Sequence, residues 1–198
     1  MSGKPQYDEG AVIDAALDAF WRHGYAATSI SVLTEVTGLS RSSLYQRFQD
    51  KDGLFEVALS TYTDRVLGRI QSSKGGNVRE RLEALLRGLM PQGGRRPGGC
   101  LLARSCAELV DLPAAGRKAA LSGMNQQRDL VEDLLREAIA SGELSAATDV
   151  TALAWYFLGV MQAILNLPQA GATGDELDRM IAFAMLAWPA GGAAHTKR

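Results

Sequence analysis

Residues 24–54, GYAATSISVLTEVTGLSRSSLYQRFQDKDGL, decide the fold, because this stretch predicts two short helices joined by a tight turn. Thr28 or Ser29 can cap the first helix, since a side-chain oxygen there accepts a hydrogen bond from an otherwise free backbone N–H. Gly38 falls at the sharp turn between the helices, and Ser40 is a natural cap for the helix that follows. The pattern therefore indicates a helix-turn-helix.

The helix after the turn, expected from about Arg41 to Phe48, has an apolar side and a polar side. Leu44 and Phe48, four residues apart, face inward. The outward side chains, with Tyr45 beside them, are Arg41, Ser42, Ser43, Gln46 and Arg47. Such a helix fits the major groove of DNA, where arginine pairs with guanine and glutamine with adenine, while serine, tyrosine and lysine commonly hold phosphates. The polar side predicts a recognition helix, and a solvated helix face is the alternative.

A longer helix, expected from about Glu9 to His23, precedes this pair. Gly24 follows it, at the place where a left-handed residue would end the helix. Its apolar residues recur at helical spacing and are Val12, Ile13, Ala16, Leu17, Ala19 and Phe20. A capped helix in register with the helix-turn-helix favours the DNA-binding interpretation over a solvated face.

Four short elements carry a family resemblance: GY-xx-TSI, the turn GLS, the LYxxF core and the following DKDGL. They resemble the DNA-binding domain of the tetracycline-repressor-like (TetR/AcrR) transcriptional regulators, strongly over residues 9–58 and only in architecture beyond. Position by position, the resemblance implies a DNA-facing set, in which Thr28, Tyr45 and Lys51 would mainly hold phosphates. The full set is Thr28, Ser40, Arg41, Ser42, Ser43, Tyr45, Gln46 and Lys51, and Arg47 joins it from its outward position.

Composition places the chain among globular all-α proteins. It has 198 residues, of which 46% are hydrophobic, and the apolar ones are mostly Ala and Leu at helical spacing without strand-like alternation. We expect an N-terminal three-helix DNA-binding domain over residues 1–52, a larger helical ligand-binding and dimerisation domain over 53–188, and a disordered tail over 189–198. No secretory start and no apolar run near the roughly 20 residues of a membrane span are evident, so we expect a cytoplasmic protein without membrane contact.

The charge distribution limits the expected affinity for DNA. The whole chain has a net charge of −1, and residues 1–60 carry five basic against eight acidic side chains, a net charge of −3. The acidic residues of the first helix lie away from Arg41, Arg47 and Lys51, which cluster around the recognition helix. We therefore expect modest non-specific affinity that depends on a local basic patch, doubled by dimerisation.

The sequence offers little for catalysis. Two cysteines and two histidines are too few for a disulfide framework or a metal cluster, and no nucleophile elbow or dinucleotide fingerprint is present. The glycine-rich segment 91–99, with Arg95 and Arg96, lacks the order of a phosphate-binding loop, so a connecting loop is favoured. We expect no enzyme activity, no catalytic residues, no metal and no cofactor.

Six further helices are expected, over residues 53–71, 78–90, 100–110, 116–141, 148–167 and 174–188. The last two are apolar almost all round, which requires burial on two sides. In TetR-like proteins the last two long helices usually pair with their copies in a dimeric four-helix bundle. We therefore expect Ile181, Phe183 and Trp188 in a homodimer interface, and a packed monomeric core is the alternative.

The resemblance also implies an inducer cavity in the second domain, although nothing in the sequence names the inducer. Apolar walls with a few polar groups are typical of small-molecule sites, and few ionisable groups occur here, which favours a hydrophobic or aromatic ligand. The candidate lining residues are Met90, Leu101, Cys106, Met124, Gln127, Trp155, Phe157, Leu158, Met161, Gln162 and Asn166.

Together these features predict a dimeric, ligand-responsive repressor that a small hydrophobic molecule releases from a palindromic operator in double-stranded DNA. Two alternatives remain open. Cys100 and Cys106 lie six residues apart near a helix start, with Arg104 nearby, and cationic neighbours favour a reactive thiolate that would sense electrophiles or oxidants. Buried cysteines are, however, often simple apolar fillers. The acidic N-terminal domain also allows a helical protein-interaction module that binds no DNA.

Overall fold

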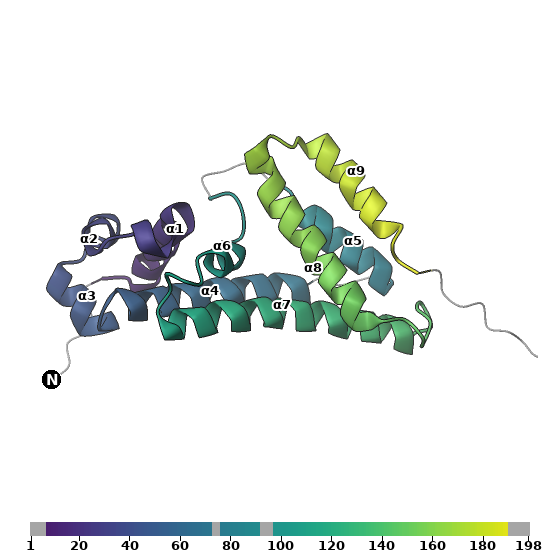
Figure 1. The fold of residues 1–198 in the computed structure, drawn as a ribbon, viewed down its shortest axis with the longest axis horizontal. Coiled ribbons are helices and arrows are strands. Elements are labelled where there is room, and N and C mark those ends of the chain that lie inside the picture. The colour runs from purple at the N-terminus through teal and green to yellow at the C-terminus, as the bar shows by residue number, and fades with distance from the viewer. Residues whose placement is uncertain (1–6, 73–75, 92–96, 190–198) are drawn as a thin grey trace, which may run out of the picture. The chain divides into compact units, whose positions relative to one another are not determined.

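The computed structural model describes residues 7–72, 76–91 and 97–189, and the regular structure in these ranges is entirely helical (Figure 1). The all-α prediction is confirmed. The predicted tail beyond Pro189 and the predicted loop residues Arg95 and Arg96 lie outside the described residues.

The chain divides into two compact units. The first unit holds residues 1–65 and 94–124, and the second holds residues 66–93 and 125–198. Two long helices, α4 (Lys51–Gln71) and α7 (Ala114–Ala140), contribute residues to both units. The predicted boundary after residue 52 separates two functions, and it stays a prediction. The boundary between the compact units is a different one, because the first unit also includes α6 (Leu101–Ala107).

The first unit begins with α1 (Glu9–Ala27), whose start is capped by the Asp8 carboxylate through the backbone N–H groups of Gly10 and Ala11. Its buried side matches the predicted apolar stripe except at Ile13, which is half-buried. Gly24 has a φ of +79°, a conformation that other residues rarely adopt, and the chain makes one further turn after it.

The helix-turn-helix forms as the sequence predicts. The hydroxyl of Ser29 accepts the Val32 N–H at 3.2 Å and caps α2 (Ile30–Thr37), so Ser29 is the cap of this helix. Gly38 ends α2 in the left-handed conformation, with φ of +69°. The next helix, α3 (Arg41–Phe48), begins where Ser40 accepts the Ser43 N–H at 3.1 Å.

Aromatic side chains fill the core of the first unit. Phe20 of α1 and Phe55 of α4 meet edge to face with their ring centroids 5.0 Å apart. Leu44 and Phe48 bury the inner side of α3, and each large side chain buried in this way stabilises the fold by about 1.5–3 kcal/mol. These contacts hold α3 with its polar side outward.

The second unit contains α5 (Val78–Gly88), α8 (Val150–Asn166), the short 3-10 helix η1 (Leu167–Ala170) and α9 (Gly174–Met185), of which α5, α8 and α9 pack against one another. Capping boxes start two of these helices, formed by Asn77 with Glu80 on α5 and by Thr173 with Glu176 on α9. The Arg87 guanidinium on α5 also pairs with the Asp178 carboxylate on α9.

One prediction about an apolar residue is wrong. Ile181 was expected at a dimer interface, but its side chain is fully buried within the chain because α9 turns it towards α5 and α8. The helical stretch Val150–Ala170 is long and apolar enough to cross a membrane by length and composition alone, a test that core helices of soluble proteins also pass, so the expectation of no membrane contact stays a prediction.

Candidate nucleic-acid interface and ligand region

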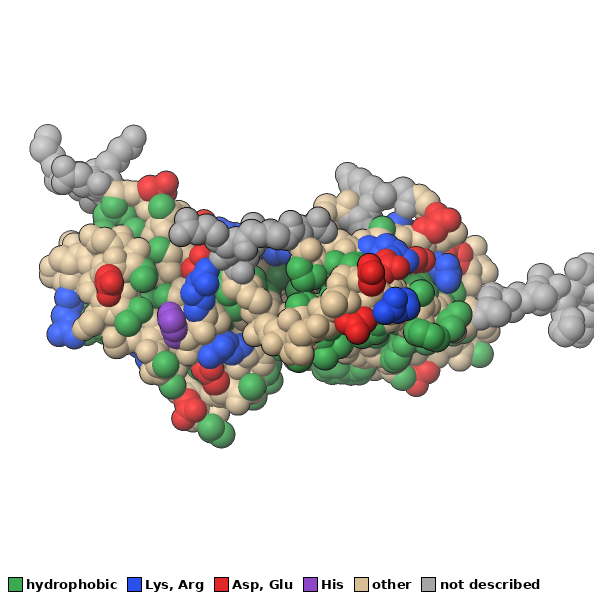
Figure 2. Space-filling model, turned by 90° about the horizontal axis from the view of Figure 1, so that it is seen from above, with side chains coloured by type: hydrophobic (Ala, Val, Ile, Leu, Met, Phe, Trp, Pro, Cys, Tyr) green, Lys and Arg blue, Asp and Glu red, His purple; other side chains and the backbone are tan. Residues whose placement is uncertain are grey.

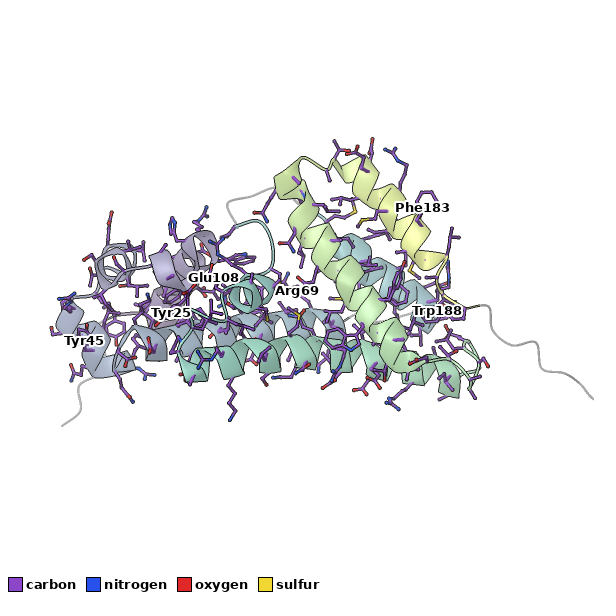
Figure 3. All side chains as sticks on the ribbon, viewed as in Figure 1. Tyr25, Tyr45, Arg69, Glu108, Phe183 and Trp188 are labelled. Carbon is purple, nitrogen blue, oxygen red and sulfur yellow. The ribbon has the colours of Figure 1, made fainter. Side chains whose placement is uncertain are left out.

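The outer side of α3 is polar and exposed over its whole length. Arg41, Ser42, Tyr45 and Gln46 are all exposed, and Figure 3 labels Tyr45 on this helix. Ser43 is half-buried, and its hydroxyl lies 2.9 Å from that of Ser40. With Arg47, which is also exposed, the surface offers two guanidinium groups, one amide and several hydroxyl groups, a set that can form hydrogen bonds with both base edges and phosphates.

At the start of α3, the hydroxyls of two serines contact that of Ser40. The hydroxyl oxygen of Ser40 lies 2.9 Å from those of both Ser42 and Ser43. The same Ser40 oxygen accepts the Ser43 N–H, so one cap organises the local hydroxyl groups. The exposed groups at this end of the helix are therefore ordered before any ligand arrives.

The exposed side chain of Arg47 forms an ion pair with another residue of the chain. Its guanidinium donates two hydrogen bonds to the Glu9 carboxylate at the start of α1, one of them from Nε at 3.0 Å. This hydrogen bonding lowers the pKa of Glu9 and raises the pKa of Arg47. A phosphate that binds Arg47 must therefore compete with Glu9. The expectation that the acidic residues of the first helix lie away from Arg47 is wrong for Glu9, because the start of α1 reaches the end of α3.

Thr28 does not lie on the outer surface. Its side chain is fully buried, and its hydroxyl donates a 2.6 Å hydrogen bond to the carbonyl oxygen of Gly24, four residues earlier. The prediction that the Thr28 side chain holds a phosphate is wrong, because the hydroxyl satisfies a backbone group of its own helix end instead.

Lys51, the first residue of α4, packs on the ring of Tyr25. Its Nζ lies 3.9 Å from the ring centroid, within the range of a cation–π interaction, and burial lowers the pKa of Lys51. The Tyr25 hydroxyl donates a hydrogen bond to the Asp52 carboxylate. Burial, together with this hydrogen bond, raises the pKa of Tyr25 well above its ordinary value, so the phenol stays protonated.

The backbone of Tyr25 is held from a distant part of the sequence. Its N–H donates to Oε2 of Glu108, just after α6, at 2.9 Å. A Cβ atom on Gly24 would collide with this carboxylate, so the glycine permits the close approach. Arg104 contacts the other carboxylate oxygen of Glu108 at 3.2 Å. In Figure 3 the labelled Tyr25 and Glu108 side chains lie where α1 meets α6.

The predicted ligand-lining residues divide between the two units. Leu101, Cys106 and Met124 belong to the first unit. In the second unit, Phe157, Leu158 and Met161 are buried side by side on the inner face of α8, and Met90 and Gln162 are half-buried. Two predicted members point outward, since Trp155 is 47% exposed and Asn166 is also exposed. The guanidinium of Arg128 lies over the Trp155 ring, 5.2 Å from its centroid.

Gln127 is the one strongly buried polar residue of the predicted set. Its side chain is 1% exposed, and its Nε2 has no hydrogen-bond partner among the residues that the structure describes. Buried amide donors are nearly always satisfied, so this group has an unused capacity to donate.

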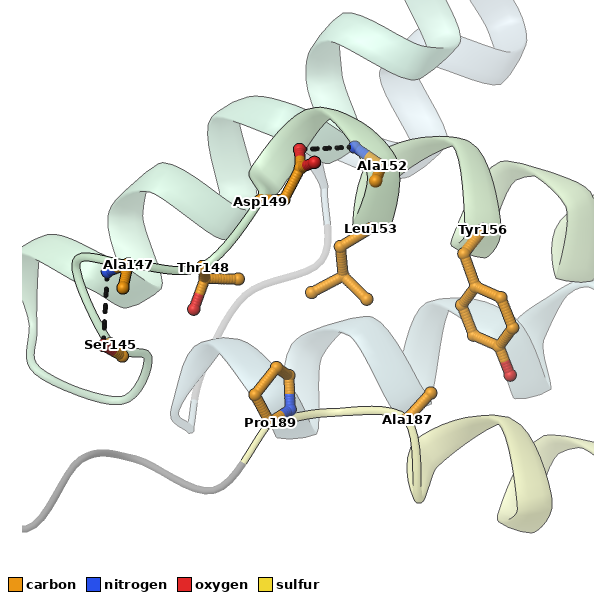
Figure 4. Close-up of a pocket in the computed structure, with 9 residues that line it drawn as sticks. All are labelled: Ser145, Ala147, Thr148, Asp149, Ala152, Leu153, Tyr156, Ala187 and Pro189. Atoms are coloured by element: carbon orange, nitrogen blue, oxygen red, sulfur yellow. Dashed lines mark hydrogen bonds between the residues drawn. The ribbon is translucent and has the colours of Figure 1, made fainter.

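Two surface pockets lie in the second unit, and neither contains a predicted ligand residue. The larger has a volume of about 560 Å³ and lies between the start of α8 and the end of the described chain (Figure 4). Asp149, which caps α8 through the Ala152 N–H, lines it together with Leu153, Tyr156 and Pro189. The smaller, of about 450 Å³, includes Trp188 beside Leu186. Both are open surface hollows beside exposed apolar side chains.

Cys106 lies in an environment that disfavours a thiolate. Cys100 is buried and Cys106 is half-buried on α6. Burial raises the pKa of the Cys106 thiol, and the nearby Arg104 pairs with Glu108. The sequence left cationic activation of the thiols open as an alternative, and the surroundings of Cys106 do not support it. Arg95 and Arg96, the other cations of that alternative, lie outside the described residues.

A capped helix-turn-helix with a polar, partly basic recognition helix, joined to a larger helical unit, defines a helical transcription factor. The family model for bacterial regulatory proteins of the tetR family matches residues 12–58, and the model for the tetracyclin repressor-like C-terminal domain matches residues 76–184. The chain therefore belongs to the TetR family of bacterial transcriptional regulators.

Individual relatives agree with this membership. The chain is 28% identical over 195 residues to the HTH-type transcriptional repressor ComR of Escherichia coli (strain K12), covering 94% of this chain and 92% of ComR. It is 31% identical over 164 residues to the transcriptional regulator AcuR of Cereibacter sphaeroides, covering 79% of this chain and 74% of AcuR. A cysteine mutant of the TetR-family regulator CifR, solved with a 26-bp double-strand operator DNA, superposes with a TM-score of 0.82 at 28% identity, covering 94% of this chain and 100% of that one.

Proposed function

We propose that this regulator is a dimeric repressor that binds a roughly palindromic operator through α3 and leaves it when a small molecule binds the second unit. Residues 1–52 would carry DNA recognition, and residues 53–188 ligand binding and dimerisation. The observation that carries the proposal is the exposed polar side of α3, held outward by the buried Leu44 and Phe48 and capped by Ser40. The operator complex of CifR supports it by similarity. Because the partner is genomic DNA, we place the protein in the cytoplasm.

The side chains of the interface have two different tasks in this proposal. Arg41 and Gln46 contact base edges in the major groove, where their planar groups can form paired hydrogen bonds with guanine and adenine. Tyr45 and Lys51 hold phosphates and set the register of the helix on the duplex, and the three serines at the start of α3 assist them. Arg47 binds a phosphate only when DNA displaces Glu9 from it. Thr28 makes no DNA contact and instead stabilises the end of α1 through its hydrogen bond to Gly24.

The dimer interface in this proposal is the outer surface of α8 and α9. Phe183 is 71% exposed and Leu186 is 76% exposed, while Trp155 and Tyr156 of α8 are exposed as well. Figure 2 shows hydrophobic side chains gathered along the surface of the second unit, and Figure 3 labels Phe183 and Trp188 there. An exposed aromatic and aliphatic patch of this kind is typical of protein interfaces. Two-fold pairing would present two α3 helices to two half-sites.

The ligand in this proposal is mainly apolar and carries at least one hydrogen-bond acceptor. Phe157, Leu158 and Met161 supply apolar walls, and the Gln127 amide supplies the donor that lacks a partner among the described residues. Such a ligand must bind the DNA-free conformation more tightly, because equal affinity for both conformations would shift nothing.

Two measurements on the purified protein test the proposal. Sedimentation should give a dimer, and footprinting on DNA from around its own gene should show protection of a two-fold symmetric segment. A monomer, or binding without any sequence preference, would contradict the proposal. A screen of small apolar compounds for release of bound DNA should then find ligands, and Gln127→Leu should weaken those that carry an acceptor oxygen.

A further inference from the structure

Tyr25 joins three parts of the first unit. Its ring lies under the Lys51 ammonium and its hydroxyl donates to Asp52, both at the start of α4. Its backbone N–H donates to the Glu108 carboxylate after α6. Its carbonyl oxygen accepts the Thr28 N–H at the entrance to α2. One half-buried residue therefore contacts the ends of α4 and α6 and the connection to the helix-turn-helix.

The position of the Lys51 ammonium depends on this ring. A lysine side chain has many rotamers, and a cation at the start of a helix receives no help from the helix dipole, which is positive there. The face of an aromatic ring attracts an ammonium group, so Tyr25 selects the rotamers that keep Nζ over the ring. A lysine held in this way loses less freedom when it binds a phosphate.

The position of Tyr25 depends in turn on Glu108. The carboxylate occupies the space beside Gly24 that any Cβ would fill, and it accepts the Tyr25 N–H in a charge-assisted hydrogen bond. Phe55 fixes the ring itself from α4, with centroids 5.0 Å apart. A displacement of the end of α6 would therefore act on Tyr25 through its backbone.

We propose that Tyr25 is a positioning residue that places Lys51 for a DNA backbone phosphate, and that Glu108 after α6 fixes Tyr25 for this task. The inference rests on the proposed function, since it assigns Lys51 to a phosphate. It identifies the residues through which α6 reaches the DNA surface.

The test measures affinity for a mixed-sequence DNA duplex as a function of salt, so that no operator or inducer has to be known. Lys51→Ala should weaken binding about 5- to 10-fold at ~0.1 M salt and reduce the slope of log K against log salt by about 0.9, as expected for one lost phosphate contact. Tyr25→Leu should weaken binding about 3-fold and reduce the same slope. The double variant should bind no more weakly than Lys51→Ala, because Tyr25 acts through Lys51.

Two matched pairs separate positioning from general stability. Tyr25→Phe keeps the ring and should leave the salt slope unchanged, although it removes the hydroxyl that binds Asp52. Glu108→Ala should speed amide hydrogen exchange at Tyr25 and reduce the salt slope, whereas Arg104→Ala, which removes only the ion pair, should do neither. Circular dichroism checks that each variant remains helical, and if Tyr25→Leu unfolds, Glu108→Ala combined with Lys51→Ala carries the same test.

The outcomes distinguish this inference from the proposed function. The inference is overturned, while DNA binding stands, if the double variant loses affinity by the product of the two single losses. It is also overturned if Glu108→Ala has the same salt slope as the wild-type protein. If the wild-type protein shows no salt-dependent binding to any duplex, the proposed function fails and the inference fails with it.

Discussion

The polar side of α3 in the first unit and the apolar side of α9 in the second unit are both exposed, but they differ in how firmly local sequence determines them. Ser40 and Gly38 fix the ends of the helices around the turn, and Leu44 with Phe48 fixes which side of α3 faces inward. On α9, Ile181 and Phe183 are two residues apart and equally apolar, yet one is fully buried and the other is exposed. Where both sides of a helix are apolar, only the packing partners decide which one is the core.

The largest expected effect comes from a charge at Ile181. Because this side chain is buried inside the second unit, Ile181→Asp should destabilise the fold by about 4–5 kcal/mol, through a buried charge without a partner. Thermal unfolding followed by circular dichroism measures the loss. If Ile181→Asp instead yields a stable, folded monomer, then Ile181 lies at the subunit interface and its burial within the chain is wrong.

A charge at the exposed Phe183 should have a different result. Phe183→Asp should leave the stability of the isolated chain within about 1 kcal/mol, because the side chain has few contacts within it, and should convert the dimer to monomer. Sedimentation at several protein concentrations measures the change. Phe183→Leu is the matched control and should remain dimeric, and a dimeric Phe183→Asp protein would place the interface elsewhere.

In the first unit, Gly24→Ala should lower the free energy of unfolding by about 1–2 kcal/mol. The φ of +79° strains any residue with a Cβ, and that atom would push the Glu108 carboxylate away from the Tyr25 N–H. Chemical denaturation measures the cost. Gly68→Ala on α4, where a Cβ would meet no other atom within 4 Å, is the control and should not destabilise. An equal effect of the two substitutions would count against a special role for Gly24.

The smallest effect concerns the charge that holds Arg47. Glu9→Gln should raise affinity for non-specific duplex about 2-fold, because the Arg47 guanidinium becomes easier for a phosphate to recruit. Asp14→Asn on the same helix removes an equal charge that pairs with Arg65 and serves as the control. Equal affinities for the two variants would show that only net charge matters at this surface.

The sequence predicted those features that depend on neighbouring residues. The bounds of α3 and its cap, the turn at Gly38 and the start of α9 at Gly174 all follow from local rules, and the structure confirms them. The family resemblance assigned Thr28 to DNA, but the hydroxyl finds the carbonyl of Gly24 four residues back. The contact between Tyr25 and Glu108 joins residues 83 positions apart, so no local pattern could have indicated it.

The ligand residues were harder to predict for a related reason. The apolar pattern of α8 correctly indicated that Phe157, Leu158 and Met161 are buried, but Trp155 has the same apolar character and is exposed. Periodicity ranks residues by hydrophobicity and cannot tell a core from a cavity wall or from a subunit interface. That the Gln127 Nε2 has no hydrogen-bond partner among the described residues became visible only once its surroundings were known.

Selection of bound sequences from a randomised DNA duplex, done in parallel with the wild-type protein and with Arg41→Ala, tests the central claim that α3 reads DNA. The wild type should enrich a two-fold symmetric sequence, and Arg41→Ala should lose preference at one symmetric pair of positions, by about 1–3 kcal/mol per lost contact, while it still binds duplex. No enrichment by the wild type, or the same preference in both proteins, would contradict the claim.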